Sequence, residues 1–269
     1  MSSTQLRRKN REMYFLEQAR TTENYVIPFL ELDESKSKRI LEIGCGECGN
    51  LLPFIQKGYD CVGVDINNIQ LEKGRKYLLK YATNFHYEII HSDIYDLNLK
   101  DLGIFDVIIM RDVIEHIFNQ RKFMAFVAPL LKPQGKFFLG FPPWQMPFGG
   151  HQQGCDSILR KLPFIHLLPR NLYRELLIFM GEKNQRVENL IDIWDTGISI
   201  DRFLRIVRDT KWNIEKSAYY FINPNYETKF GLKPRRVIFP LGHLPFFRNF
   251  YTTCMYVVLK KFEITNEVY

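Results

Sequence analysis

An apolar segment that ends in a glycine-rich turn constrains the fold of this chain more than any other feature. Residues 39–44 read RILEIG, and the stretch 44–49, GCGECG, holds three glycines and two cysteines. Glycine allows positive φ angles and a close approach of the backbone to a ligand. An apolar strand followed by such a turn and then a helix is typical of a parallel sheet.

The same alternation continues to residue 141. Helical spacing at 50–58, 67–82 and 120–131 separates short apolar segments that we interpret as strands, at 39–44, 61–65, 85–93, 105–110 and 136–141, and KPQG (132–135) is expected to be a turn. Ser199 is a suitable N-cap for a helix that precedes two more strands, at 213–224 and 251–261. We therefore expect an α/β fold with a doubly wound, mostly parallel seven-stranded sheet whose last strand is antiparallel.

This alternation of strands and helices divides the chain into four predicted regions. Residues 1–38 form an N-terminal helical segment, and residues 39–141 form a cofactor-binding core. Residues 142–198 start with PPWQMPFGGHQQ and then show mainly helical patterning. They are expected to be an insertion after strand five that serves the substrate or covers the site. Residues 199–269 complete the core.

Composition limits the class of protein. Hydrophobic residues make up 46% of the 269 residues, enough for a sizeable core, and the net charge of +7 is read as a solvated basic surface. The five scattered cysteines indicate reduced thiols. No apolar region follows the basic start, and no apolar run approaches the roughly 18 residues of a membrane span. We expect a cytoplasmic protein.

Several ligands are compatible with a glycine-rich turn. Cys45 and Cys48 lack a second cysteine pair or histidines at ligand spacing, so no metal site is expected here. A phosphate loop would need a Gly-Lys-Ser/Thr ending, which is absent from the sequence. Gly44, Gly46 and Gly49 match the Gly-x-Gly-x-x-Gly string of dinucleotide sites, so an NAD-dependent oxidoreductase stays open as an alternative.

Acidic residues mark the ends of neighbouring strands. Glu42 lies two residues before the first glycine, Asp65 ends the second strand, and Asp93 follows the third. The carboxyl ends of parallel strands meet at one crevice, where a carboxylate can accept hydrogen bonds from ribose hydroxyls. These positions favour a ligand that contains a nucleoside.

Together the segments LEIGCGECGN, VGVDI, HSDIYDL and FDVIIMRDVIEHI resemble the successive motifs of class I S-adenosylmethionine-dependent methyltransferases. The resemblance covers residues 39–141, and the part from 199 onward is compatible with it. It departs from the family pattern at position 48, where Cys stands in place of the last glycine of the family's acidic-x-Gly-x-Gly-x-Gly motif. The resemblance implies a Rossmann-like fold, S-adenosylmethionine as cofactor and methyl transfer as activity.

This resemblance also assigns roles to individual residues. It implies that the methionine part of the cofactor faces the turn, that Asp65 binds the ribose, and that Asp93 binds the adenine amino group. Arg111 and Asp112 are expected near the sulfonium or the methionine carboxylate. The full set implied for cofactor binding is Glu42, Gly44, Cys45, Gly46, Asp65, Ile66, Ser92, Asp93, Ile94, Arg111 and Asp112.

Methyl transfer from a sulfonium is an in-line displacement, so the protein must chiefly align the two reactants and exclude water. An oxygen nucleophile also has to lose a proton, and histidine is the usual base. His151, directly after strand five, and His116, in DVIEHI, are the catalytic candidates. His166, inside LPFIHLLP, is expected to be a packing residue.

The acceptor is expected to be a small molecule or a lipid-linked or glycan-linked one, with O-methylation favoured. The segment 158–181 mixes basic and apolar residues, so a lid, a dimer contact and a peripheral membrane contact all stay open. Nucleic acid is not favoured, because no Asn/Asp-Pro-Pro-Tyr motif follows strand four. A methyltransferase-like module that binds without catalysing is the remaining alternative, and the oligomeric state is left open.

Overall fold

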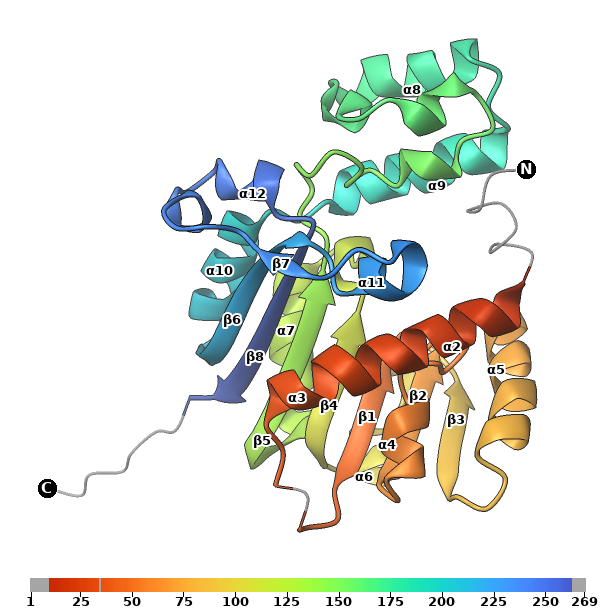
Figure 1. Ribbon diagram of the computed structural model, residues 1–269, viewed down its shortest axis with the longest axis vertical. Helices are drawn as coiled ribbons and strands as arrows, with labels where there is room; N and C mark the ends of the chain where they lie inside the picture. The colour runs from red at the N-terminus through yellow and green to blue at the C-terminus, as the bar shows by residue number, and fades with distance from the viewer. Residues whose placement is uncertain (1–9, 34, 263–269) are drawn as a thin grey trace, which may run out of the picture.

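The protein is built around one twisted sheet. The computed structural model describes residues 10–33 and 35–262 (Figure 1). The sheet has eight strands in the order β3-β2-β1-β4-β5-β8-β6-β7. Five of them pair in parallel, as the strand pattern predicted: β1 (Arg39–Ile43), β2 (Asp60–Asp65), β3 (Tyr87–His91), β4 (Phe105–Arg111) and β5 (Leu131–Phe141).

The second half of the chain extends the sheet beyond β5. β8 (Cys254–Lys261) pairs antiparallel with β5, and β6 (Trp212–Ile222) pairs antiparallel with β8. The predicted antiparallel last strand is therefore confirmed. An eighth strand, β7 (Arg235–Arg236), pairs with β6 at the sheet edge and was not predicted, because two arginines show no strand periodicity.

One turn was predicted wrongly. Residues 132–135 belong to β5, whose pairing with β4 jumps from Phe105–Leu131 to Val107–Lys136. The additional residues form an irregularity of the bulge type within the strand pair. The Lys-Pro-Gln-Gly composition therefore marks a break in pairing and not the end of an element.

Helices cover both faces of the sheet, since the parallel strands are apolar on both sides. One face carries a continuous helical stretch of α2 (Arg11–Thr21), η1 (Thr22–Val26) and α3 (Ile27–Leu30), together with α4 (Leu52–Gln56) and α5 (Asn68–Tyr81). The other carries α6 (Leu99–Leu102), α7 (Gln120–Val127), η4 (Ala128–Leu130) and α10 (Ile200–Asp209). Ser199 caps α10 by accepting from the Arg202 N–H at 3.0 Å, as predicted.

Residues 142–198 lie beyond the carboxyl ends of the parallel strands, at the top of Figure 1. They hold η5 (Gln152–Gly154), η6 (Ile158–Lys161), η7 (Ile165–Leu167), α8 (Arg170–Phe179) and α9 (Asn184–Thr196). Tyr173, Leu177 and Ile191 belong to a small hydrophobic cluster of their own.

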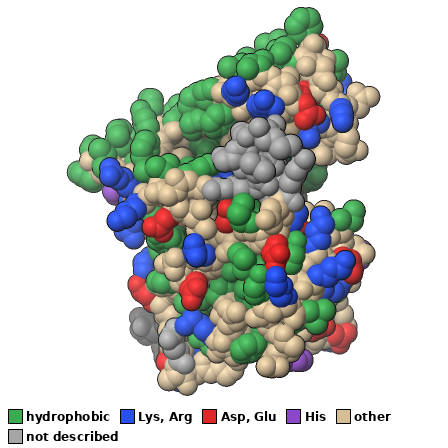
Figure 2. All heavy atoms as spheres, turned by 45° about the vertical axis from the view of Figure 1, so that its right-hand side comes forward, with side chains coloured by type: hydrophobic (Ala, Val, Ile, Leu, Met, Phe, Trp, Pro, Cys, Tyr) green, Lys and Arg blue, Asp and Glu red, His purple; other side chains and the backbone are tan. Residues whose placement is uncertain are grey.

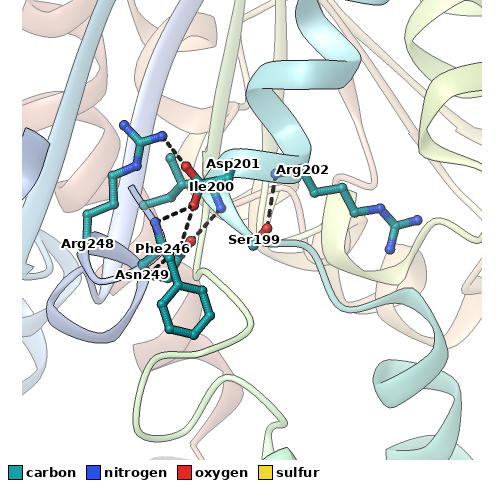
Figure 3. A network of polar contacts seen from close by, with 7 residues as sticks. All are labelled: Ser199, Ile200, Asp201, Arg202, Phe246, Arg248 and Asn249. Carbon is teal, nitrogen blue, oxygen red and sulfur yellow. Dashed lines mark hydrogen bonds and ion pairs between the residues drawn. The ribbon is translucent and has the colours of Figure 1, made fainter. Parts of the chain in front are cut away.

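The link between β6 and β8 reaches the same side of the molecule. It contains α11 (Asn225–Phe230), η8 (Leu241–His243) and α12 (Arg248–Tyr251). A carboxylate of α10 fastens this link (Figure 3): Asp201 accepts from the side chains of Arg248 and Asn249, and from the Phe246 N–H at 3.1 Å. Asn249 in turn accepts from the Ile200 N–H at 2.7 Å.

Both upper segments expose large hydrophobic side chains (Figure 2). The most exposed is Phe179 of α8, at 85%. We call this surface the apolar face and define it by seven residues that are at least half exposed: Ile158, Leu172, Phe179, Ile238, Phe239, Phe246 and Phe247. The rings of Phe164 and Phe250, 6.3 Å apart, connect the insertion with the β6–β8 link. Among the described residues, no helix is both long and apolar enough to span a bilayer.

Candidate cofactor and acceptor site

The glycine-rich loop between β1 and α4 is tightly constrained. Gly44 and Gly46 have φ angles of 72° and 53°, and the Gly44 N–H donates to the Val64 carbonyl at 2.8 Å. A Cβ on Gly44 would lie 2.6 Å from a methyl carbon of Val113, so the position has no room for a side chain. Cys48 also has a positive φ, 63°, so the position keeps the left-handed backbone that glycine would adopt more readily.

Asp65, at the end of β2, is fixed by two backbone donors. Its Oδ2 accepts from the Gly46 N–H and its Oδ1 from the Asn67 N–H, both at 2.7 Å. The side chain stays half-exposed, and an ionised carboxylate has lone pairs beyond the two that accept these bonds. The neighbouring Ile66 is 72% exposed and offers an apolar surface beside the carboxylate. This pairing of residues suits a nucleoside.

The end of β3 lies next to Asp65. The Ser92 N–H donates to the Asp65 carbonyl at 3.1 Å, and Asp93 accepts from the Tyr95 N–H at 2.9 Å, where it caps η2 (Ile94–Asp96). Asp93 itself is exposed. Ile94 and Cys45 are buried, at 6% and 1% exposure, so a cofactor would meet their backbone rather than their side chains.

A buried network lies beneath the loop. Glu42 accepts from Asn50 Nδ2 at 2.6 Å, and Asn50 Oδ1 accepts from Arg111 at 2.7 Å and from Thr22 Oγ1 at 3.1 Å. Arg111 also donates to Asn225 Oδ1 at 2.9 Å. Its guanidinium thus donates to Thr22, Asn50 and Asn225, and its position near the sulfonium or the methionine carboxylate stays a prediction.

Glu42 has one carboxyl oxygen to spare. Its side chain is fully buried, and within residues 10–33 and 35–262 Oε2 has no hydrogen-bond partner. Burial raises the pKa of Glu42 to about 8, although the Asn50 hydrogen bond and the charge of Arg111 act in the opposite direction. A buried carboxyl with an unpaired oxygen, next to a loop built for close backbone approach, fits the ammonium group of a methionine-derived ligand.

Asp112 follows β4 in a left-handed conformation, with a φ of 54°, and its N–H donates to the Gly140 carbonyl at 2.8 Å. Its side chain is exposed. Because Val113 packs against Gly44, the end of β4 adjoins the glycine-rich loop. Asp112 therefore lies on the same edge of the sheet as Asp65 and Asp93.

The two histidines proposed as catalytic residues lie together. The ring centroids of His116, in η3 (Ile114–His116), and His151 are 5.1 Å apart, with 69° between the ring planes. Burial lowers the pKa of His151 to about 4 and also lowers the pKa of His116. Both rings are therefore neutral near neutral pH, with a nitrogen lone pair available.

A rigid turn presents His151. Added Cβ atoms on Gly149 and Gly150 would each lie 2.2 Å from a neighbour, the Trp144 carbonyl oxygen and His166 Cβ respectively. His166 is fully buried and its Nε2 lies 2.7 Å from the Trp144 oxygen, which agrees with the packing role predicted for it. His151 follows this Gly-Gly pair in a left-handed conformation, with a φ of 57°.

Sequence reasoning missed four residues near this edge: Thr22, Asn50, Glu115 and Asn225. Asn50 closes the motif LEIGCGECGN, and Glu115 precedes His116 in DVIEHI, so both stood inside segments that were singled out. A separate hollow of about 770 Å³ lies between α10 and the start of β6, at the opposite edge of the sheet. It contains none of the predicted site residues.

Comparison with known proteins points to methyltransferases. A family model described as a methyltransferase domain matches residues 15–148. The ubiquinone biosynthesis O-methyltransferase of Pelagibacter ubique is 30% identical over 182 residues, 66% of this chain and 73% of that protein. The protein of the same name from Bartonella bacilliformis is 30% identical over 130 residues, 46% of this chain and 50% of that protein.

The fold itself has solved counterparts. The magnesium protoporphyrin IX methyltransferase of Synechocystis PCC 6803, with bound S-adenosylhomocysteine, superposes with a TM-score of 0.55 at 12% identity, covering 91% of this chain and 83% of that one.

The chain belongs to the S-adenosylmethionine-dependent methyltransferases. S-adenosylmethionine is the cofactor that this family uses. The chain spans about half of the length of the first curated relatives that it matches. The relatives are methyltransferases by name, so the oxidoreductase and the non-catalytic alternatives are not favoured.

Proposed function

We propose that this protein transfers the methyl group of S-adenosylmethionine to an oxygen atom of an amphiphilic acceptor. The observation that carries the proposal is the union of the Gly44–Gly46 loop, the fixed carboxylate of Asp65 and the unpaired oxygen of Glu42 at one edge of the sheet. The carboxylate of Asp65 can accept hydrogen bonds from the ribose hydroxyls of the cofactor. The unpaired oxygen of Glu42 can accept one from its ammonium group.

In this proposal each part of the edge has one task. Asp65 binds the ribose, Ile66 and Asp93 bind the adenine, and Glu42 binds the methionine ammonium. The cofactor, when bound, supplies an activated methyl group on a positive sulfur. Asp112, His116 and His151 then lie on the acceptor side, where they bind the acceptor oxygen and accept its proton.

Oxygen is favoured as the acceptor atom for two reasons. Curated relatives are named O-methyltransferases. Neutral histidines such as His116 and His151 also suit the removal of a hydroxyl proton, because a protonated imidazole cannot act as a base.

An amphiphilic acceptor is favoured by the apolar face. It lies on the side of the molecule to which the parallel strands point, the side that also carries the site (Figure 1). The curated relatives act, by name, in the biosynthesis of ubiquinone. We propose an acceptor of this kind, with a hydroxylated head and an apolar tail, for this chain as well.

The same face favours a phospholipid membrane as the place where the acceptor is met. The rings of Phe164, Phe250, Phe246 and Phe247 form an unbroken series of contacts, with centroid distances of 6.3, 5.4 and 5.5 Å. Exposed basic residues adjoin both upper segments: Arg160, Lys161, Lys233, Arg235 and Arg236. Aromatic rings flanked by cations suit the headgroup region of an anionic bilayer. We place the reaction at the cytoplasmic surface, in keeping with five free, buried thiols.

Calorimetry with S-adenosylhomocysteine tests the cofactor site. The wild-type protein should bind it, and Asp65→Ala should weaken binding about 100-fold, because two charge-assisted hydrogen bonds are lost. Asp60→Ala is the matched control, since Asp60 begins the same strand at the opposite edge and pairs with Arg39 at 3.0 Å. Its affinity should equal that of the wild type.

Absence of binding by the folded wild-type protein would refute the proposed function. Equal affinities of the Asp65 and Asp60 variants would remove Asp65 from the site while leaving the family assignment intact.

A further inference from the structure

One carboxyl group and two imidazoles form a cluster that cofactor binding does not explain. One ligand atom from each of Glu115, His116 and His151 lies within 4.8 Å of the other two. Glu115 and His116 are neighbours in η3, whereas His151 comes from the turn after β5. The fold therefore assembles the cluster from two loops.

Glu115 is the unusual member of this cluster. It is 2% exposed, and across the described part of the chain neither of its carboxyl oxygens has a hydrogen-bond partner. Its backbone cannot easily move, because Thr196 Oγ1 donates to the Glu115 carbonyl at 2.6 Å and Gln120 ties the same loop to the end of α9. A buried carboxyl with two unpaired oxygens is unfavourable unless a cation compensates it.

The histidines are suitable partners for such a cation. Imidazole nitrogens are common ligands of transition metals, and the rings of His116 and His151 lie close together, with centroids 5.1 Å apart. His151 follows the tightly packed Gly149–Gly150 pair and is half-buried, whereas the residue His116 lies at the protein surface.

We propose that Glu115, His116 and His151 bind one divalent transition-metal ion through two imidazole nitrogens and one carboxylate oxygen. This donor set suits Zn²⁺, Fe²⁺, Co²⁺ or Mn²⁺. Ligands about 2.1 Å from a tetrahedral ion lie about 3.4 Å from one another, so the exposed His116 ring turns inward on binding. Three protein ligands leave a position open, as in metal sites that bind a substrate.

The open position gives the ion a role, and that role rests on the proposed function. The cluster lies beside Asp112, on the acceptor side of the edge. An acceptor hydroxyl bound there loses its proton to water more readily, because the ion stabilises the oxyanion. The oxygen then forms its bond to the methyl carbon as the carbon–sulfur bond breaks, leaving S-adenosylhomocysteine. With the ion bound, water takes the proton whose removal falls to His116 and His151 in the metal-free site.

Cobalt(II) is the probe, because its visible absorption reports imidazole and carboxylate ligation directly. Full-length protein is treated with a chelator, desalted and titrated with Co²⁺ without cofactor. The expected result is one Co²⁺ per chain with a saturating visible band, which Zn²⁺ displaces. Glu115→Gln and His151→Ala should each weaken Co²⁺ binding by about 100-fold or more, since loss of an outer partner alone already costs up to that factor.

His86→Ala is the matched control, because it removes an exposed imidazole at the start of the third strand region, away from the cluster. It should bind Co²⁺ like the wild type. Circular dichroism and S-adenosylhomocysteine binding of every variant establish that the fold is kept.

Two results would overturn the metal site: no saturable Co²⁺ binding by the wild type, or binding that Glu115→Gln and His151→Ala leave unchanged. Because cofactor binding is measured separately, a protein that binds the cofactor but no metal refutes this inference alone. A protein that binds metal but no cofactor refutes the proposed function instead.

Discussion

At the scale of single residues, Glu42 shows how a buried group is prepared for a ligand. Asn50 lies between Glu42 and Arg111: it donates to the Glu42 carboxyl and accepts from the Arg111 guanidinium. The second oxygen of Glu42 has no partner in residues 10–33 and 35–262. Because burial raises its pKa to about 8, the Glu42 carboxyl of the cofactor-free protein is mostly neutral near pH 7. An arriving ammonium favours the carboxylate, so binding and ionisation are linked.

We therefore predict that S-adenosylhomocysteine binding releases a proton from Glu42, up to about one per site near pH 7. Calorimetry in buffers of different ionisation enthalpy measures this number. Glu42→Gln keeps an acceptor for Asn50 but cannot ionise, so it should bind more weakly and release no proton from this position. Identical proton release by both proteins would contradict the assignment of Glu42.

The raised pKa of Glu42 also makes the stability of the fold depend on pH. A carboxyl whose folded pKa exceeds its unfolded value stabilises the fold below the unfolded pKa and loses this contribution as the pH rises through the folded value. The cofactor-free protein should therefore lose stability between about pH 5 and 8 from this group, and Glu42→Gln should lack that part of the slope.

At the scale of elements, the β6–β8 link depends on α10. Burial alone would raise the pKa of Asp201, but hydrogen bonds from Asn249, Arg248 and the Phe246 backbone lower it overall. These bonds hold a segment that exposes Ile238, Phe239 and Phe247 to solvent and gains little from packing. Hydrogen bonds to one carboxylate of α10 therefore hold the link, in place of apolar packing.

Asp201→Ala should destabilise the protein by about 2–3 kcal/mol and loosen residues 238–251, because Arg248 and Asn249 lose their common partner. Denaturant unfolding and hydrogen exchange measure the two effects. Asp209→Ala is the control from the same helix: its partner Arg121 is 60% exposed, against 13% for Arg248, so the loss should stay below about 1 kcal/mol. Equal losses in both variants, with unchanged exchange at 238–251, would show that the link is held in another way.

At the scale of the whole molecule, exposed apolar side chains gather on the side that carries the site. The chain has a net charge of +7 and no described helix that could cross a bilayer. Its apolar face is contributed by two segments that are far apart in sequence and meet at Phe164 and Phe250. Such a surface suits reversible adsorption to a membrane rather than insertion.

The double variant Phe179→Ser/Phe247→Ser should bind vesicles that contain phosphatidylglycerol at least about tenfold more weakly, because each serine removes roughly 1.5 kcal/mol of apolar transfer. Co-sedimentation measures the loss. Ile104→Ser serves as the control, since Ile104 is 49% exposed beside the start of β4, at the opposite edge. Equal binding by the double variant and the control would rule out the apolar face as the membrane contact.

The sheet was predictable because its central strands are nearly continuous apolar runs. Ile108 and Ile109 face opposite sides of β4 and are both fully buried, so the sequence had no polar period to obscure the strand. The cap of α10 was equally readable, since Ser199 acts on a residue three positions away. Sequence patterns predict a contact well when its partners are close together in the sequence.

Contacts between distant segments were not predictable. Asn50 meets Thr22, Arg111 and Glu42 across three elements, and nothing in its own neighbourhood marks it as their meeting point. Glu115 stood next to His116 in the quoted motif, yet the unpaired state of its oxygens depends on burial beneath α9. The cofactor roles drawn from the family resemblance, from Gly44 to Asp112, stay predictions until binding is measured.

The position of β8 between β5 and β6 carries a consequence for biosynthesis. A ribosome delivers this strand after all the others, so β5 and β6 each emerge with one edge unpaired, the edge that β8 later occupies. Exposed edges of this kind attract other chains. The newly made protein therefore has an interval, ended by the arrival of residues 254–261, during which a chaperone holding the open half of the sheet would raise the yield of folded protein.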